Sequence, residues 1–509
     1  MKIKRLLFCL ALLAAATCLQ AQAPAGQAAG EAQATRDVRQ LSKQEIDEIA
    51  DLSVLQRMAA GYAKIGDGER LTWTYERLYA LFPNSGDYAF ALAALHARKG
   101  DKTKTYDILL KMKEQGYGID LVNDKRFEKV ADTELWQYLS QSLKANMAPF
   151  GEGKLAFELP KGDTLYESLA WDPKRQQLLV GSARDGSIQL VSKDGKLKPF
   201  IQPDATNGLW GVYALAADAP RDLLYVAAAA STYFRGFSEA DLGKSAVFKF
   251  QLSSGKFLAR YLAPGEGTHT LTSITVGKGG QMFVADGRRN VIYRVDGDAL
   301  KVVAADPNLK SLRGLAVSDD GKLLYFADYM LGIFGIHLAT GKGFAVEYNP
   351  ASLALGGIDG LYWYDGTLVA IENGMRPQRV MRLTLSPEGS KITRVMPLDV
   401  ARPEFKLPTY GAVAGDKLYF IANSQRNLYG QYGDLKQDAV PEPVKVFESD
   451  LRFAWGQTGI NTSVMPVRAA PLDEGKKLMQ TKPSLMDGPE PRVEPETPET
   501  KKSDDKKGD

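Results

Sequence analysis

Hydrophobic positions follow two different patterns along the chain. Between residues 41 and 150 they recur at three- and four-residue steps, which predicts amphipathic helices. Between residues 154 and 465, short apolar runs alternate with turns rich in Gly, Asp and Asn, which predicts short β-strands. We therefore expect a mainly β protein in which a small all-α domain precedes a larger all-β domain.

The helical segment repeats itself at an offset of 34 residues. Residues 58–67 (MAAGYAKIGD) align with residues 92–101 (LAALHARKGD), so that small residues and a terminal Gly-Asp recur in place. A 34-residue period with a glycine after the helix resembles the tetratricopeptide repeat, and Gly66 and Gly100 would allow left-handed turns there. We expect residues 121–143 to cap the stack. Two interpretations remain open: a groove for a peptide or partner protein, or a packing module attached to the larger domain.

One β pattern recurs six times in the second segment. Each copy has an opening residue, an apolar strand, a turn and a second apolar strand, and the spacings between copies are 43, 62, 41, 46 and 51 residues. Periods near 40–50 residues are typical of four-stranded propeller blades, so we predict a six-bladed β-propeller. The long second spacing predicts an insertion at residues 231–244. The strand at residues 154–159 would complete the last blade and close the ring.

Closure of the propeller would place the six opening residues around one mouth of the central channel. We expect a small-molecule ligand, if there is one, to bind at this mouth. The predicted ring consists of Glu167, Trp210, Thr272, Arg313, Asp359 and Tyr410.

Three of these copies resemble blades of the gluconolactonase and senescence-marker-protein (regucalcin) family. The similar blocks are residues 167–173 (ESLAWDP), 313–325 (RGLAVSDDGKLLY) and 358–361 (IDGL). The resemblance implies a divalent cation in the channel, held by a Glu from the first blade, an Asn from the fourth and an Asp from the fifth that also acts as base. Glu167 and Asp359 match this pattern, whereas Arg313 stands at the Asn position. Thr272-Ser273 replaces the Asn-Asp pair of the family's third blade.

Two functions follow from this comparison. The first is a binding or scaffold protein that uses its helical groove and its propeller mouth. The alternative is a lactonase-like hydrolase that depends on Ca²⁺ or another divalent cation, with Glu167 and Asp359 as ligands and Asp359 as candidate base. Whether the protein is an enzyme stays open. Carboxylates that converge while Arg313 turns away would favour the hydrolase, and an arginine that bridges both would favour the scaffold.

Other polar residues are candidates for the mouth. His269 lies just before the third opening residue, where it would either act as acid or base or have a structural role. Asn373-Gly374 and Asn423-Ser424 follow predicted inner strands, and either shape the mouth or only form turns.

The two ends of the chain predict export and a solvated tail. Lys2, Lys4 and Arg5 precede an apolar run at residues 6–19, so we expect a signal peptide at residues 1–23 and a linker at residues 24–40. A periplasmic or secreted protein follows, with lipid attachment at Cys18 as the minor alternative and no membrane span in the mature chain. Removing the signal removes both cysteines and leaves 61 basic against 61 acidic residues, which gives no support to nucleic-acid binding. Residues 466–509 hold no aromatic residue, and we expect them to be disordered.

Overall fold

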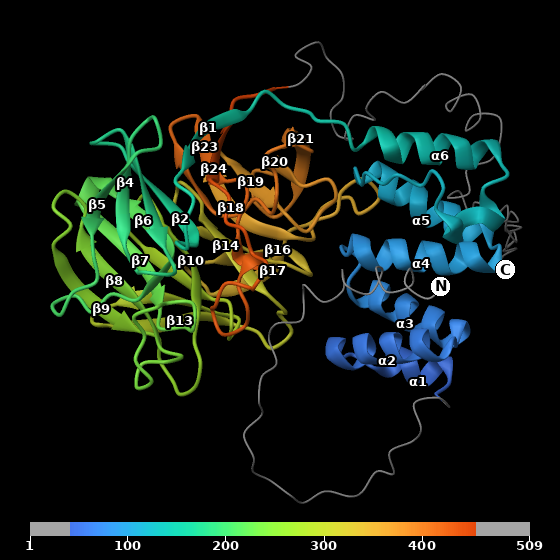
Figure 1. Cartoon of the computed structure of the whole chain (residues 1–509), viewed down its shortest axis with the longest axis horizontal. Coiled ribbons are helices and arrows are strands. Elements are labelled where there is room, and N and C mark those ends of the chain that lie inside the picture. The colour runs from blue at the N-terminus through green and yellow to red at the C-terminus, as the bar shows by residue number, and fades with distance from the viewer. Residues whose placement is uncertain (1–40, 455–509) are drawn as a thin grey trace, which may run out of the picture. The chain divides into compact units, whose positions relative to one another are not determined.

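The computed structural model describes residues 41–454, in which helices precede strands along the chain (Figure 1). The predicted signal peptide and linker, Cys18, and the predicted tail at residues 466–509 lie outside the described residues. Within residues 41–454, no helix combines the length and the apolar character that a membrane span requires.

The α-helical part begins with helix pairs that repeat at the predicted offset. The helices are α1 (Lys43–Glu48), α2 (Leu52–Ile65), α3 (Gly68–Leu81), α4 (Gly86–Lys99), α5 (Lys102–Glu114), the short 3₁₀ helix η3 (Lys125–Val130) and α6 (Glu134–Ala145). Both α2 and α3 start 34 residues before their counterparts α4 and α5. Gly66 and Gly100 end α2 and α4 with φ angles of +76° and +78°, where a glycine avoids the strain of a left-handed backbone. The helical domain is thus confirmed, and its tetratricopeptide likeness stays a prediction.

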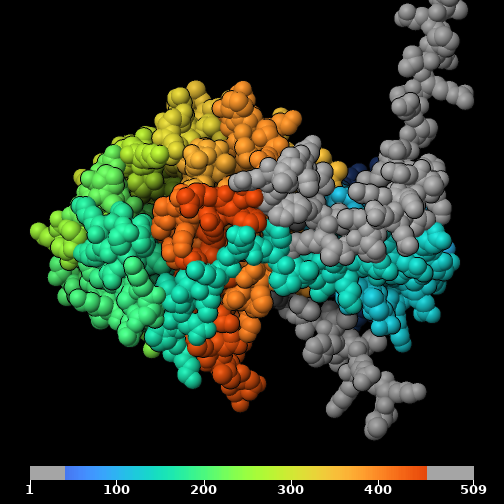
Figure 2. All heavy atoms as spheres, turned by 90° about the horizontal axis from the view of Figure 1, so that it is seen from above, coloured from blue at the N-terminus to red at the C-terminus, as the bar shows by residue number. Residues whose placement is uncertain are grey.

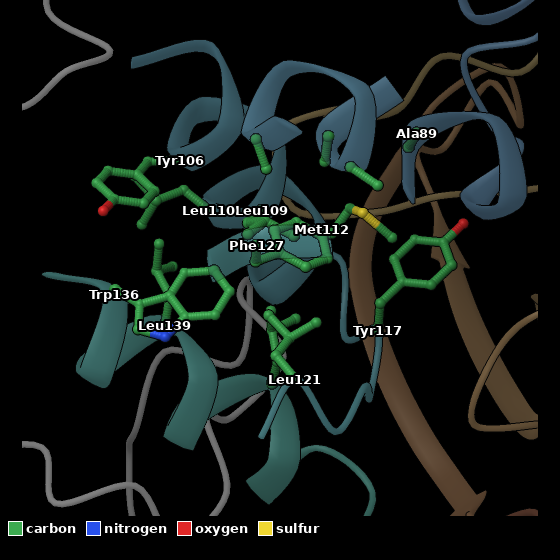
Figure 3. Close-up of a cluster of buried hydrophobic side chains, with 14 of the residues drawn as sticks. Ala89, Tyr106, Leu109, Leu110, Met112, Tyr117, Leu121, Phe127, Trp136 and Leu139 are labelled. Atoms are coloured by element: carbon green, nitrogen blue, oxygen red, sulfur yellow. The ribbon is translucent and has the colours of Figure 1, made fainter. Parts of the chain in front are cut away.

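Large apolar side chains hold the last three helical elements together. In Figure 3, Phe127 from η3 and Trp136 and Leu139 from α6 point toward Leu109 and Leu110 of α5. The rings of Phe127 and Trp136 are 5.3 Å apart, and Phe127 and Leu139 are fully buried. Residues 121–143 therefore cover one end of the helical stack, as predicted.

The strands that follow the helices form six antiparallel sheets of four strands each, which confirms the six-bladed propeller. Blade 1 holds β2 (Tyr166–Asp172), β3 (Gln177–Ser182), β4 (Ile188–Val191) and β5 (Leu197–Ile201). Blade 2 holds β6 (Gly211–Asp218), β7 (Leu223–Ala229), β8 (Ser245–Gln251) and β9 (Phe257–Leu262), with a 3₁₀ turn η4 (Ala219–Arg221). Blade 3 holds β10 (Leu271–Val276), β11 (Met282–Asp286), β12 (Val291–Asp296) and β13 (Ala299–Ala305).

The second half of the ring continues in the same order. Blade 4 holds β14 (Leu312–Val317), β15 (Leu323–Asp328), β16 (Gly332–His337) and β17 (Lys342–Ala345). Blade 5 holds β18 (Ile358–Tyr364), β19 (Thr367–Glu372), β20 (Arg379–Leu385) and β21 (Ile392–Val400). Blade 6 holds β22 (Gly411–Ala414), β23 (Lys417–Ile421), β24 (Val444–Asp450) and β1 (Lys154–Leu159), with η5 (Arg426–Leu428) before β24.

The two ends of the propeller segment meet in blade 6. Strand β1 pairs with β24 through Lys154–Glu448 at one end and Leu159–Val444 at the other. In Figure 2 the orange-red residues near the end of the described chain lie beside teal residues from the region of β1. The predicted closing strand is therefore confirmed, and it pairs the free edge that β24 would otherwise expose.

The helical domain contacts the loops of blades 4 and 5. The buried Asn84 side chain donates from Nδ2 to the carbonyl of Leu331 at 2.9 Å, and its Oδ1 accepts from the hydroxyl of Tyr348 at 2.8 Å and the N–H of Leu355 at 3.2 Å. The fully buried Arg379 guanidinium pairs with Glu372 and donates to the carbonyl of Gln115. A side of the helical domain is therefore a packing surface for the propeller.

Candidate functional site at the channel mouth

Backbone bulges position the residues at the mouth of the channel. In blades 1 to 5, the pairing between the inner strand and its neighbour shifts register at the start of the inner strand. A bulge bends the strand locally and re-aims the extra side chain, which is a common device beside functional sites. The residues left in these bulges are Glu167, Tyr213, Thr272, Arg313 with Gly314, and Asp359. In blade 6, Tyr410 takes the corresponding place directly before β22.

Tyr213, rather than the predicted Trp210, holds this position in blade 2. Trp210 is buried in an apolar cluster, where its ring meets that of Phe248 at 5.6 Å and the guanidinium of Arg260 lies 5.7 Å away. Tyr213 is buried, and its hydroxyl forms a 2.7 Å hydrogen bond with the hydroxyl of Ser231 in the predicted insertion. Burial raises the pKa of Tyr213 to about 12. The sequence prediction missed it because the second copy was taken to open at Trp210, three residues before the register shift.

Glu167 is fully buried and paired with an arginine from the last blade. Its Oε1 accepts from the hydroxyl of Ser424 at 2.8 Å, and its Oε2 accepts from Nη2 of Arg426. The charge of Glu167 raises the pKa of Arg426, against the effect of burial. Arg426 begins η5, in the loop between β23 and β24, and was not identified from the sequence. The only signal for this loop was the predicted turn at Asn423-Ser424.

Asp359 is held by neutral donors and faces a second arginine. Its Oδ2 accepts from the hydroxyl of Thr409 at 2.6 Å and from Nδ2 of Asn373 at 3.1 Å. Nε of Arg313 lies 3.6 Å from Oδ1, beyond hydrogen-bonding distance. The Asn373 side chain also accepts from the hydroxyl of Tyr329 at 2.8 Å, and the Arg313 guanidinium lies over the Tyr329 ring, 5.8 Å from its centre. Asn373 and Ser424 thus belong to the site, although they follow the second strands β19 and β23 and not the inner strands.

Three donors in the ring are buried without a hydrogen-bond partner among the described residues. They are Nε of Arg313 and the hydroxyls of Thr272 and Tyr410. Burial raises the pKa of Tyr410, and the charge of Asp359 raises it further while Arg313 and Arg426 oppose that effect. A buried polar group without a partner costs about 1–3 kcal/mol, so these three groups point to a missing acceptor at the mouth.

The other two predicted mouth residues have different surroundings. His269 is buried, its Nδ1 lies 2.7 Å from Oδ2 of Asp286, and its Nε2 lies 3.3 Å from the carbonyl of Gly265. Asp286 also accepts from the backbone N–H of Thr270, so this His–Asp pair ties the loop before β10 to the end of β11. Thr272 lies in the bulge at the start of β10, with its hydroxyl buried and without a hydrogen-bond partner among the described residues.

The donor set does not fit the divalent cation that the family resemblance implies. Each carboxylate at the mouth faces a guanidinium, Glu167 that of Arg426 and Asp359 that of Arg313. A cation placed between the carboxylates would be repelled by both arginines, and unit charges 4 Å apart interact by roughly 4 kcal/mol at an effective dielectric constant of 20. Among the described residues, no cluster of three or more His, Cys, Asp or Glu side chains could hold a metal ion.

A cavity of about 320 Å³ lies in the channel next to the ring. Tyr410 is one of its lining residues, and most of the others lie on the inner strands, where small residues such as Ala214 and Gly314 stand beside large ones such as Trp171 and Trp363. This volume is at the lower end of the range for small-molecule sites.

The comparisons with known proteins found similar solved structures only. No family model matches the sequence, and no curated protein matches it. Among solved structures, a gluconolactonase from Xanthomonas campestris is 14% identical, with a TM-score of 0.40 over 60% of this chain and 92% of its own. A putative oxidoreductase (glucose dehydrogenase) from Thermus thermophilus is 17% identical, with a TM-score of 0.39 over 58% of this chain and 100% of its own. A virginiamycin B lyase from Staphylococcus aureus is 16% identical, with a TM-score of 0.39 over 59% of this chain and 100% of its own.

These structural neighbours include a gluconolactonase, which belongs to the family that the sequence blocks resemble, and a virginiamycin B lyase. The activities named for these proteins differ, and similarity at this level does not select one activity for this chain.

Proposed function

We propose that this protein is a binding protein whose propeller mouth takes a small organic molecule without a metal ion. The observation that carries the proposal is the pairing of each mouth carboxylate with an arginine, while Arg313 and Tyr410 keep donors without partners. Paired carboxylates are poor cation ligands, and unpaired donors favour a ligand that supplies acceptors.

The helical domain supports the mouth in this proposal. Asn84 fixes the loops that hold Leu331 and Leu355, and the Leu331 loop begins with Tyr329. Tyr329 in turn contacts Asn373, which holds Asp359. Hydrogen bonds and the short backbone segment from Tyr329 to Leu331 therefore join the helical domain to the mouth. A peptide groove on the helical domain, and export of the protein to the periplasm or beyond, remain part of the proposal as predictions from the sequence.

The test measures thermal unfolding of the full-length chain in excess EDTA with four separate compounds: glucose, γ-butyrolactone, serine and mandelate. We expect at least one compound to raise the melting temperature, and Arg313→Met to abolish that rise. Arg98→Met, which changes an exposed arginine on α4, should leave it unchanged. Stabilisation that requires an added divalent cation, or no stabilisation by any of the four compounds, would refute the proposal.

A second candidate is the lactonase-like hydrolase. The observation that favours it is the placement of Glu167 and Asp359 in equivalent bulges of blades 1 and 5, at one mouth of the channel. In this reading Asp359 would take a proton from an attacking water, because Oδ1 carries no hydrogen bond. Calorimetric titration with Ca²⁺, Mg²⁺, Mn²⁺ and Zn²⁺, followed by a lactone hydrolysis assay, separates the two candidates. Saturable cation binding that Glu167→Gln removes would favour the hydrolase.

A further inference from the structure

The mouth offers more free donors than free acceptors. The Arg313 side chain makes no hydrogen bond to any described residue, although only 24% of it is exposed. Arg426 uses Nη2 for Glu167, and its other guanidinium nitrogens form no hydrogen bond within residues 41–454. The hydroxyls of Tyr410 and Thr272 add two more free donors. A ligand that satisfies this mouth must be rich in acceptors.

The charge of the mouth limits the charge of the ligand. Glu167 and Asp359 are balanced by Arg313 and Arg426, so the four groups together carry no net charge. With no excess of positive charge at the mouth, each negative charge on a ligand adds repulsion from the two carboxylates, so a dianion is disfavoured more strongly than a monoanion. A planar carboxylate, by contrast, carries one negative charge and matches the fork of a guanidinium that has no other hydrogen bond.

One acceptor at the mouth remains open. Oδ1 of Asp359 accepts no hydrogen bond from the described residues, because Nε of Arg313 stays 3.6 Å away. An ammonium group placed there would lie close to Arg313, whereas a hydroxyl can donate to Oδ1 without adding a positive charge. Arg313 and Asp359 therefore present a carboxylate site and a hydroxyl site side by side.

We propose that the ligand is a 2-hydroxy carboxylate, an inference that rests on the metal-free binding site proposed above. Its carboxylate faces the Arg313 guanidinium and accepts from the hydroxyl of Tyr410. Its hydroxyl donates to Oδ1 of Asp359. The rest of the molecule extends past Tyr410 into the 320 Å³ cavity, which Tyr410 also lines.

The experiment compares three ligands that differ by one group. Mandelate carries both the carboxylate and the hydroxyl, mandelamide lacks the charge, and phenylacetate lacks the hydroxyl. Calorimetric titration of the full-length chain in EDTA should give an affinity for mandelate at least ten times that for either analogue. Loss of the charge-assisted contact with the guanidinium accounts for the weaker binding of mandelamide, and loss of the hydroxyl that donates to Oδ1 of Asp359 accounts for that of phenylacetate.

Two variants test the assigned residues. Arg313→Met should reduce the affinities for mandelate and mandelamide to the same value, while the exposed Arg98→Met control keeps the tenfold difference. Tyr410→Phe removes a hydroxyl that has no partner in the described residues. It should therefore weaken mandelate binding at least fivefold without lowering the melting temperature, which a purely structural role would not produce.

The outcomes separate this inference from the function on which it rests. Equal binding of mandelate and mandelamide would overturn the hydroxy-acid assignment and leave the metal-free site in place. The assignment also fails if phenylacetate binds as tightly as mandelate, or if Tyr410→Phe leaves the affinity for mandelate unchanged. Binding of all three compounds only in the presence of a divalent cation would overturn both proposals.

Discussion

The pair formed by Glu167 and Arg426 gives the sharpest test of the site's electrostatics. Arg426→Met keeps most of the apolar volume of the side chain but leaves the Glu167 carboxylate buried, with one hydrogen bond from Ser424. Removing one partner of a buried ion pair costs about 3–5 kcal/mol. Because 36% of the Arg426 side chain is exposed, water screens part of the interaction, and we expect a loss of about 3 kcal/mol in the free energy of unfolding.

The assay is urea denaturation at pH 7, followed by intrinsic fluorescence. With a slope of about 3 kcal/mol/M, the loss shifts the unfolding midpoint by about 1 M. The double variant Glu167→Gln, Arg426→Met removes the buried charge as well and should recover about 2 kcal/mol of that loss. If the double variant is as unstable as Arg426→Met alone, Glu167 is not held as a buried carboxylate by this arginine, and the reasoning against a metal site fails with it.

Two further predictions concern buried groups outside the mouth. Burial raises the pKa of Asp399 to about 6, so the folded chain holds this proton more tightly than the unfolded chain does. The stabilisation from this proton is complete below about pH 4 and is lost as the pH rises through 6. The free energy of unfolding of Asp399→Asn, relative to wild type, should therefore rise by up to about 3 kcal/mol between pH 4 and pH 7 in urea denaturation. A difference that stays constant with pH would contradict the assigned pKa. Asn84→Ala removes three hydrogen bonds between the helical domain and the propeller and should destabilise the chain by about 3 kcal/mol, whereas the exposed Asn427→Ala should change stability little in the same assay.

Local sequence patterns predicted the architecture because they depend on interactions between residues that are close together along the chain. The two-residue alternation of each inner strand and the turns between strands recur once per blade, and six recurrences determine six blades. The 34-residue offset of the helices and the left-handed Gly66 and Gly100 follow from short-range backbone geometry in the same way. The closing strand β1 was predictable because it stood outside the six copies and lacked a partner.

The site was only partly predictable. Glu167, Thr272, Arg313, Asp359 and Tyr410 were identified because each opens an inner strand. Tyr213 was missed because the second copy was taken to open at Trp210, three residues before the register shift in β6, and only the pairing with β7 shows which residue the bulge holds.

By itself, the sequence determined the order of the domains, the number of blades and five of the six ring positions, because hydrophobic periodicity depends on near neighbours. Only the tertiary structure decided what those positions face. Arg426 reaches Glu167 across 259 residues when the ring closes, and His269 pairs with Asp286 instead of entering the site. Such pairs are set by closure of the sheets into a ring, which brings together side chains that no local spacing connects.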